Sequence, residues 1–172
     1  METKTNMEKT KKQKLAIVVS PRSVLGKKGK IYDAHAYVAW GDKAHMQDRF
    51  DFTADSRKEA IEGLLRDIET VRETTVAVYD RTGVCLFCDG YRKWYFRFAH
   101  GGGMSFGADG FAAALAIVEE GYKDHPACQG FFTEYKVMAG PEFQAQRGEI
   151  FKRYRALHVS ESGLGGSETL QP

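Results

Sequence analysis

Alternation between apolar and polar residues predicts that the chain opens with three strands and a helix. Residues 15–20 form an apolar, β-branched run that is typical of a buried strand, ended by Pro21. Residues 32–40 alternate strictly, and after a turn at 41–43 the chain is expected to return as a strand over 46–53. The segment Ser56-Arg57-Lys58-Glu59 is a capping-box pattern and precedes an apolar stripe at helical spacing. The stripe consists of Ala60, Ile61, Leu64, Leu65 and Ile68.

A similar order of elements recurs after residue 74. Residues 76–79, 84–88 and 91–98 are predicted strands, and a second helix is expected to begin near Asp109. The two helix entries can be superimposed, with Ala54-Asp55 falling on Ala108-Asp109. The pattern indicates two βββα units, over 14–72 and 74–123, with a shared sheet as one arrangement. Chance agreement between two amphipathic helices explains the same match equally well.

The last part of the chain predicts one more helix. Residues 131–137 are compatible with a seventh strand or with a loop, and Pro141 opens a helix over 141–157. The sequence therefore predicts an α+β fold, with about six antiparallel strands and two to three helices. A single domain over 14–158 would lie between a disordered basic tail, 1–13, and a disordered tail over 159–172.

The strand at 91–98 is expected to present two different faces. It follows Asp89-Gly90, a pair suited to a tight hairpin turn, and its side chains should alternate between the two sides of the sheet. Arg92, Trp94, Phe96 and Phe98 are expected to face the core. The opposite side carries the basic/aromatic row, which we define as Tyr91, Lys93, Tyr95 and Arg97.

Charge is unevenly distributed along the 172 residues. The net charge is +2, but residues 1–30 contain nine lysine and arginine residues and two glutamates, so the rest of the chain is acidic. A basic arm can bind phosphate backbones or acidic partners, although a solubilising disordered tail is the favoured interpretation of residues 1–13 taken alone. The start of the chain is polar, and no apolar run approaches the length that spans a bilayer. We therefore expect a cytoplasmic protein with no membrane association, and an odd number of cysteines, three, fits reduced thiols.

Two cysteine-containing motifs suggest a zinc site. Cys85 and Cys88 form a C-x2-C, and His125 and Cys128 form an H-x2-C, which together would supply four ligands to tetrahedral zinc. The strand context opposes this assignment, because residues three apart in a strand point to opposite faces. Buried thiols that serve packing are the favoured interpretation, and no cofactor is expected.

A serine motif suggests nucleophilic chemistry. Residues 103–107 fit G-x-S-x-G around Ser105, between a predicted strand and a predicted helix, and His100-Gly101-Gly102-Gly103 is similar to an oxyanion loop. Asp124, His125 and His158 are the available triad partners, supported by chain order alone. The alternatives are a glycine-rich connection without catalytic role and a phosphate cradle at the helix start.

These patterns favour a non-catalytic binding module, with single-stranded nucleic acid as the first hypothesis. Phosphate contacts would come from Lys27, Lys28, Lys30, Lys93 and Arg97, and base stacking from Tyr91 and Tyr95. The first alternative is a protein–protein adaptor or inhibitor, which would form a homodimer through an edge strand. The second is a small hydrolase that uses Ser105.

Overall fold

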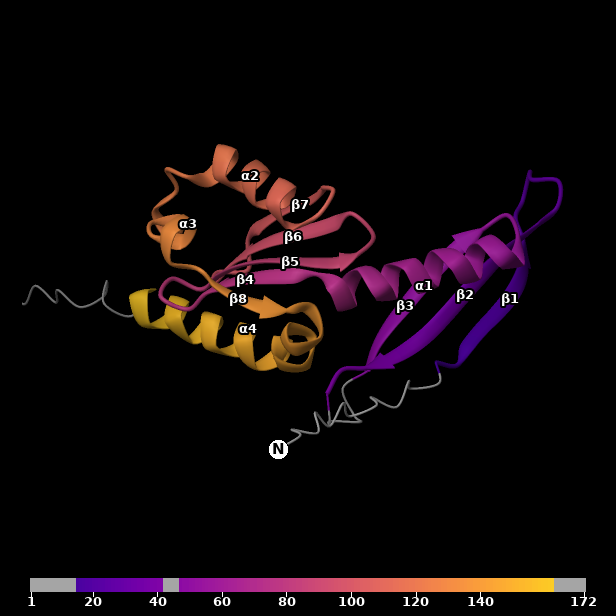
Figure 1. The fold of residues 1–172 in the computed structure, drawn as a ribbon, viewed down its shortest axis with the longest axis horizontal. Coiled ribbons are helices and arrows are strands. Elements are labelled where there is room, and N and C mark those ends of the chain that lie inside the picture. Colours follow the sequence, from indigo (N-terminus) through magenta and orange to yellow (C-terminus); the bar gives the residue numbers. More distant parts are fainter. Residues whose placement is uncertain (1–14, 42–46, 163–172) are drawn as a thin grey trace, which may run out of the picture.

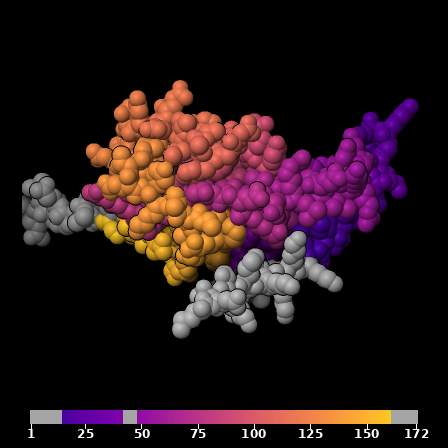
Figure 2. Space-filling view, in the orientation of Figure 1, coloured from indigo at the N-terminus to yellow at the C-terminus, as the bar shows by residue number. Residues whose placement is uncertain are grey.

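A computed structural model describes residues 15–41 and 47–162, and within them the chain has an α+β fold (Figure 1). Eight strands form two separate antiparallel sheets, one of three strands and one of five. The described part is elongated, with the indigo residues of the first hairpin projecting from one end (Figure 2). None of the helices in these residues is both long and apolar enough to cross a membrane.

The first unit is a three-stranded sheet with one helix on it. Strands β1 (Ile17–Ser23), β2 (Lys30–Ala39) and β3 (Gln47–Ala54) pair in that order, and α1 (Arg57–Glu73) packs on one face. A side chain at Gly63 would meet the ring of Phe52 at 2.3 Å, so this glycine lets α1 approach the sheet closely. The core between helix and sheet contains Ala34, Ala36, Val38, Phe50, Ala60, Leu64, Ile68 and Val71.

The second unit has three layers. Its sheet has the order β7-β6-β5-β4-β8, formed by Gly103–Gly107, Lys93–Phe98, Val84–Gly90, Thr75–Tyr79 and Lys136–Ala139. Helices α2 (Phe111–Tyr122) and α3 (Phe131–Glu134), with the short 3-10 turn η1 (Pro126–Cys128), cover one face. Helix α4 (Gly140–Ser162) covers the other face, with Phe143, Ile150 and Tyr154 buried against it (Figure 1).

Several local predictions are confirmed. The N-cap of α1 is Ser56, whose hydroxyl accepts a hydrogen bond from the Glu59 amide at 3.2 Å. The predicted helix over 141–157 lies within α4, which continues to Ser162. Trp94, Phe96 and Phe98 are buried in the core, as the alternation of the strand predicts.

The predicted hairpin turn at Asp89-Gly90 is wrong. Strand β5 continues through Gly90 with an irregularity between Cys88 and Gly90, and Gly90 pairs with Lys93. The turn is therefore formed two residues later, by Tyr91 and Arg92, and Arg92 has a left-handed backbone with φ of 58°. Arg92 is exposed in this turn and pairs with Asp109 at 2.8 Å, so its expected place in the core is also wrong.

The arrangement of the two units differs from a simple repeat. Strand β7 lies between β6 and α2, so four strands precede the second helix, and the units do not share a sheet. The segment 131–137 contributes α3 and the start of β8. The tails over 1–13 and 163–172 lie outside the described residues, whereas 159–162 belong to α4.

Candidate functional site

The basic/aromatic row is divided between a turn and a crowded strand face. Tyr91 lies in the β5–β6 turn, while Lys93, Tyr95 and Arg97 face α4 from β6. Tyr95 is half-buried and stacks on Phe87, with ring centroids 5.4 Å apart. The guanidinium of Arg97 lies 4.8 Å from the centre of the Tyr95 ring. A base could stack on Tyr95 only by displacing these neighbours.

The predicted phosphate contacts fall into two distant groups. Lys27, Lys28 and Lys30 belong to the hairpin tip, defined here as residues 24–30, and Lys27 forms an ion pair with Asp55 just before α1. The β5–β6 turn lies beside the second half of α1, where Asp67 Oδ1 accepts the Tyr91 amide at 2.9 Å. Twelve residues at 1.5 Å each separate these two points by roughly 18 Å along the helix. Lys93 and Arg97 therefore do not share a surface with the hairpin tip.

The three cysteines are free and buried, and they do not converge. Cys85 packs on the α4 side of the sheet, whereas Cys88 and Cys128 pack on the α2 side. Burial raises the pKa of the Cys85 thiol to about 12 and that of Cys128 to about 11. Within the described residues, no group of three or more His, Cys, Asp or Glu side chains could hold a metal ion. These thiols serve packing here.

Ser105 lies on an edge strand instead of a strand-to-helix turn. Its segment forms β7, in which Met104 and Phe106 point toward the core and Ser105 is exposed opposite Tyr95. A side chain at Gly103 would meet the Phe96 carbonyl oxygen at 1.9 Å, so this glycine serves close strand pairing. His125 and His158, named as its partners, line a pocket that does not include Ser105.

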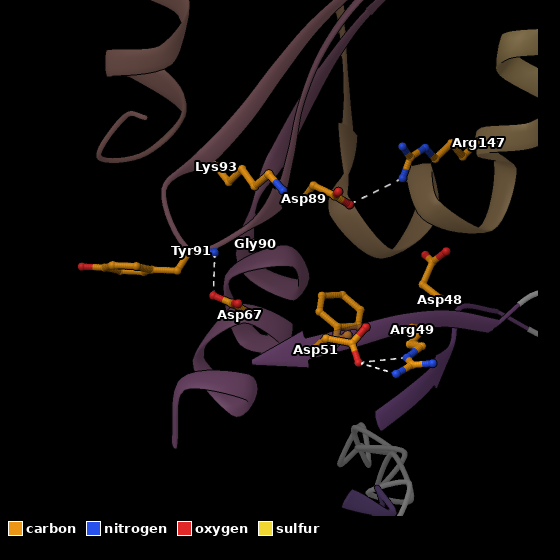
Figure 3. A pocket seen from close by; sticks show the side chains of 10 residues that line it. Asp48, Arg49, Asp51, Asp67, Asp89, Gly90, Tyr91, Lys93 and Arg147 are labelled. Atoms are coloured by element: carbon orange, nitrogen blue, oxygen red, sulfur yellow. Dashed lines mark hydrogen bonds and ion pairs between the residues drawn. The ribbon is translucent and has the colours of Figure 1, made fainter. Parts of the chain in front are cut away.

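A charged cleft of about 400 Å³ separates the two units (Figure 3). Asp48 and Asp51 approach from β3, Asp67 from α1 and Asp89 from β5. Most of these carboxylates are engaged in contacts. Asp51 pairs with Arg49 at 2.8 Å, Asp67 accepts the Tyr91 amide, and Asp89 pairs with Arg147 of α4 at 3.5 Å. Burial raises the pKa of the Asp48 carboxyl, against weaker opposing effects of the Trp40 indole and Arg147. The cleft is therefore lined largely by compensated charges, and of these contacts the Asp67–Tyr91 bond joins the two units.

The face of the three-stranded sheet away from α1 has no helix packed on it among the described residues, and it carries an exposed aromatic side chain. We call it the open sheet face. Tyr37 stands on its central strand with 53% of its surface exposed, and the His35 ring meets the Tyr37 ring edge-on at 6.3 Å. On the edge strand β1, Val18 is 51% exposed. The face consists of Val18, Ser20, Arg22, the buried Ile31, Asp33, His35, Tyr37, Arg49, Asp51 and Thr53.

The arginines and aspartates of the open sheet face form ion pairs with one another, whereas only one of the three lysines of the hairpin tip forms an ion pair among the described residues. Arg22 donates to both carboxylate oxygens of Asp33, at 2.7 and 3.3 Å, and Thr53 donates to the same carboxylate at 2.6 Å. These hydrogen bonds hold the pKa of the Asp33 carboxyl below its usual range, and the bond from Arg22 has the largest effect. Among the described residues, no carboxylate lies within ion-pair distance of Lys28 or Lys30. The tip therefore offers uncompensated positive charge beside the sheet.

The alternation in the sequence puts Asp33, His35 and Tyr37 opposite the apolar side chains of the same strand, but nothing in the sequence marks them as a site. The strict alternation over 32–40 carried that signal. The missing information was tertiary, namely that α1 packs on one face of this sheet while no other helix of the described residues packs on the opposite face.

No protein-family model, curated protein or solved structure matches this chain. The structure defines the class as an α+β protein with two antiparallel sheets. The first sheet and its helix form a two-layer unit, and the second sheet with helices on both faces forms a three-layer unit. Any statement about its function therefore depends on the surfaces described above.

Proposed function

We propose that this protein binds single-stranded nucleic acid on the open sheet face, with Tyr37 as the stacking residue. The observation that carries the proposal is the exposure of Tyr37 at the middle of an antiparallel sheet whose face is open. Single-stranded bases have their faces free, and sheets that bind them commonly present aromatic rings for stacking. His35, beside Tyr37, supplies a second ring on the same strand.

Charge supports nucleic acid over an apolar partner. Arg49 lies directly across from Tyr37 on β3, and Lys28 lies in the hairpin tip at the far end of the same sheet. Lys30 is seven residues from Tyr37 on β2, so its side chain starts from the α1 side of the sheet. At about 3.4 Å per residue, a nucleic acid strand that runs along β2 would cover roughly 24 Å from the Tyr37 ring to the tip. Asp33 and Asp51 lie on this path, but each is already held by an arginine. Those arginines can exchange a carboxylate for a phosphate oxygen as partner.

The energies expected from this geometry are moderate. Stacking of one base on an aromatic side chain contributes about 1 to 3 kcal/mol, which corresponds to about 5- to 150-fold in affinity. Each phosphate neutralised on a single strand changes the slope of log affinity against log salt by about 0.7. Lys28 would contribute about that slope once.

The test is fluorescence anisotropy with labelled single-stranded DNA, single-stranded RNA and duplex, each at two salt concentrations. Tyr37→Ala should weaken single-strand binding about 5- to 150-fold, and Tyr37→Phe should retain it. The matched control is Tyr91→Ala, because Tyr91 is 51% exposed on the second unit and its removal should leave single-strand binding unchanged. If Tyr91→Ala or Tyr95→Ala weakens binding and Tyr37→Ala does not, the basic/aromatic row is the site. Absence of binding at low salt would refute the function itself.

The lysines of the hairpin tip are tested by salt dependence. Lys28→Gln should lower affinity for all sequences and reduce the salt slope by about 0.7, as loss of one phosphate contact does. Lys123→Gln removes the same charge at the C-cap of α2, outside the first unit, and serves as control. Equal changes in both variants would indicate a long-range charge effect without a contact.

A protein–protein adaptor that forms a homodimer is the second candidate. Strands β1 and β7 are end strands of their sheets, and Val18 is exposed on β1. End strands present unpaired backbone groups to which another strand can add. Light scattering during size exclusion measures the mass in solution, and a dimer that Val18→Lys converts to monomer would favour this candidate. The free cysteines fit a cytoplasmic location, which belongs to the same set of proposals.

A further inference from the structure

Three histidines from separate parts of the sequence line one pocket in the second unit. His100 lies in the β6–β7 turn, His125 precedes η1, and His158 belongs to the last turns of α4. The pocket has a volume of about 290 Å³. It lies at the end of β6 remote from the β5–β6 turn, hence far from the open sheet face. The remaining lining residues are Thr82, Phe98, Ala99, Pro126 and Ala127.

Two of the rings are fixed against the same phenyl group. The imidazole of His100 stacks on Phe98 with a centroid distance of 5.2 Å and an interplanar angle of 12°. The centroid of the His125 imidazole lies 4.9 Å from that of the Phe98 ring and 6.0 Å from that of the Tyr122 ring. This packing holds both imidazoles before any ligand arrives, which lowers the entropy cost of binding.

Backbone hydrogen bonds determine which ring nitrogens carry protons. The Gly102 amide donates to His100 Nδ1 at 3.1 Å, and the Ala127 amide donates to His125 Nδ1 at 3.1 Å. A nitrogen that accepts a hydrogen bond has no proton, so each neutral imidazole must carry its proton on Nε2. Both residues line the pocket, and the N–H donor of each neutral ring is therefore on Nε2.

Gly102 shows that this arrangement constrains the sequence. A side chain at this position would lie 2.5 Å from Cε1 and 2.9 Å from Nδ1 of His100. Glycine thus allows the imidazole to lie over the backbone amide that fixes its tautomer. The glycine run that resembles an oxyanion loop in the sequence serves, at this residue, to hold a histidine.

The polarity of these bonds opposes a metal site. A metal-bound imidazole normally donates its second N–H to a carbonyl or a carboxylate. Here the second nitrogen of both rings accepts from an amide, which is the opposite polarity. The described residues also contain no set of three or more ligands that could hold a metal ion. N–H donors suit an anion instead.

We propose that this pocket binds a small oxyanion, a carboxylate or a phosphate monoester, through Nε2–H of His100 and His125. The hydroxyl of Thr82 is already used, because it donates to the Ala127 carbonyl. Phe98, Ala99 and Pro126 give the pocket an apolar wall that suits the organic part of such a ligand. At roughly 30 Å³ per water-sized group, the pocket has room for about ten of them. This site is independent of the nucleic-acid surface.

The first experiment uses the full chain with 15N-labelled histidine. The ring nitrogen spectrum should show the Nε2–H tautomer for His100 and His125. Inorganic phosphate and benzoate are then titrated in parallel, with sodium chloride at matched ionic strength as control. Shifts of both rings with phosphate alone indicate a phosphate monoester, and shifts with benzoate alone indicate an organic carboxylate. The Nδ1–H tautomer in both rings, or no shift with either anion at 50 mM (about the weakest binding of interest), would overturn the proposal.

Variants separate binding from folding. His100→Phe and His125→Phe keep a ring against Phe98 but lose the donor, and each should weaken anion binding at least about tenfold. His35→Phe, on the open sheet face, makes the same chemical change and should leave anion binding unchanged. All three proteins are compared by thermal unfolding, and the tautomer measurement on the parent decides the matter if a variant fails to fold. Zinc that binds tightly and removes the Nε2–H signals would contradict the anion assignment. His100→Phe and His125→Phe should still bind oligonucleotides, so the two proposals fail separately.

Discussion

The neighbouring leucines of α1, Leu64 and Leu65, provide a direct test of how this helix lies on the three-stranded sheet. The sequence pattern places both in one apolar stripe. In the structure Leu64 is fully buried against the sheet, whereas Leu65 is 43% exposed. The matched substitutions Leu64→Ala and Leu65→Ala therefore remove the same atoms from two different environments.

The expected costs differ by several-fold. Leu64 packs in a core whose strand side chains include Ala34 and Ala36, which are too small to fill a cavity. Removal of a fully buried leucine side chain costs about 2 to 5 kcal/mol. Leu65 loses only partial burial, and alanine is slightly the better helix former, so its cost should stay below about 1 kcal/mol. In a chain of this length about 3 kcal/mol corresponds to a fall in Tm of about 6 to 12 °C.

Urea unfolding followed by circular dichroism measures both variants. The midpoint of Leu64→Ala should shift strongly with an unchanged slope, since the slope reports the surface exposed on unfolding. Equal losses would mean that both leucines face the sheet, as the stripe in the sequence indicates. A larger loss for Leu65→Ala would mean that α1 is rotated by about 100°, the angle between successive residues. Either result would refute the packing described here.

Three further outcomes follow from the described contacts. Gly140→Ala should destabilise the fold by about 2 kcal/mol or more, because its side chain would meet the Val71 carbonyl oxygen at 1.9 Å, and an unchanged Tm would contradict this. Burial raises the pKa of Asp48, so the folded state holds that proton to higher pH than the unfolded state and stability falls as pH rises through the raised pKa. Asp48→Asn should therefore lose this part of the pH dependence and be more stable than the parent at neutral pH, as urea midpoints between about pH 4 and 8 can show. Because the pKa of Cys85 is about 12 and that of Cys128 about 11, the native thiols should resist a thiol reagent at roughly pH 8 and react once urea unfolds the chain; rapid native reaction would contradict the burial.

The fold class could be predicted because its signals are local. Alternation identifies a strand whichever sheet it joins, and a capping serine such as Ser56 marks a helix start without knowledge of its partners. The predicted position of the hairpin turn was wrong for a related reason. Asp89 and Gly90 are residue types that favour a turn, but Gly90 still pairs with Lys93 of β6, so the turn is formed by Tyr91 and Arg92. Tertiary pairing decided between two acceptable local solutions.

The surfaces could not be predicted, because exposure depends on which helix covers which face. Tyr37 and Tyr95 both stand on alternating strands with cations nearby, and their sequences do not distinguish them. Helix α4 packs on the β6 face that carries Tyr95, and α1 packs on the side of β2 away from Tyr37. The histidine pocket was equally hidden, since His100 and His158 are far apart in sequence and meet only at the end of α4.

The direct junction between α1 and β4 makes the helix a spacer of fixed length. It begins at Arg57, two residues after Asp55, which pairs with Lys27 of the hairpin tip, and after a single residue, Thr74, the chain enters the five-stranded sheet. Its 17 residues span about 25 Å as a rigid rod. Removal of one residue would swing the first sheet by about 100° relative to the second, while removal of a whole turn would shorten the separation by about 5.4 Å with little rotation. The register of this one helix thus sets both the distance and the relative orientation of the open sheet face and the histidine pocket.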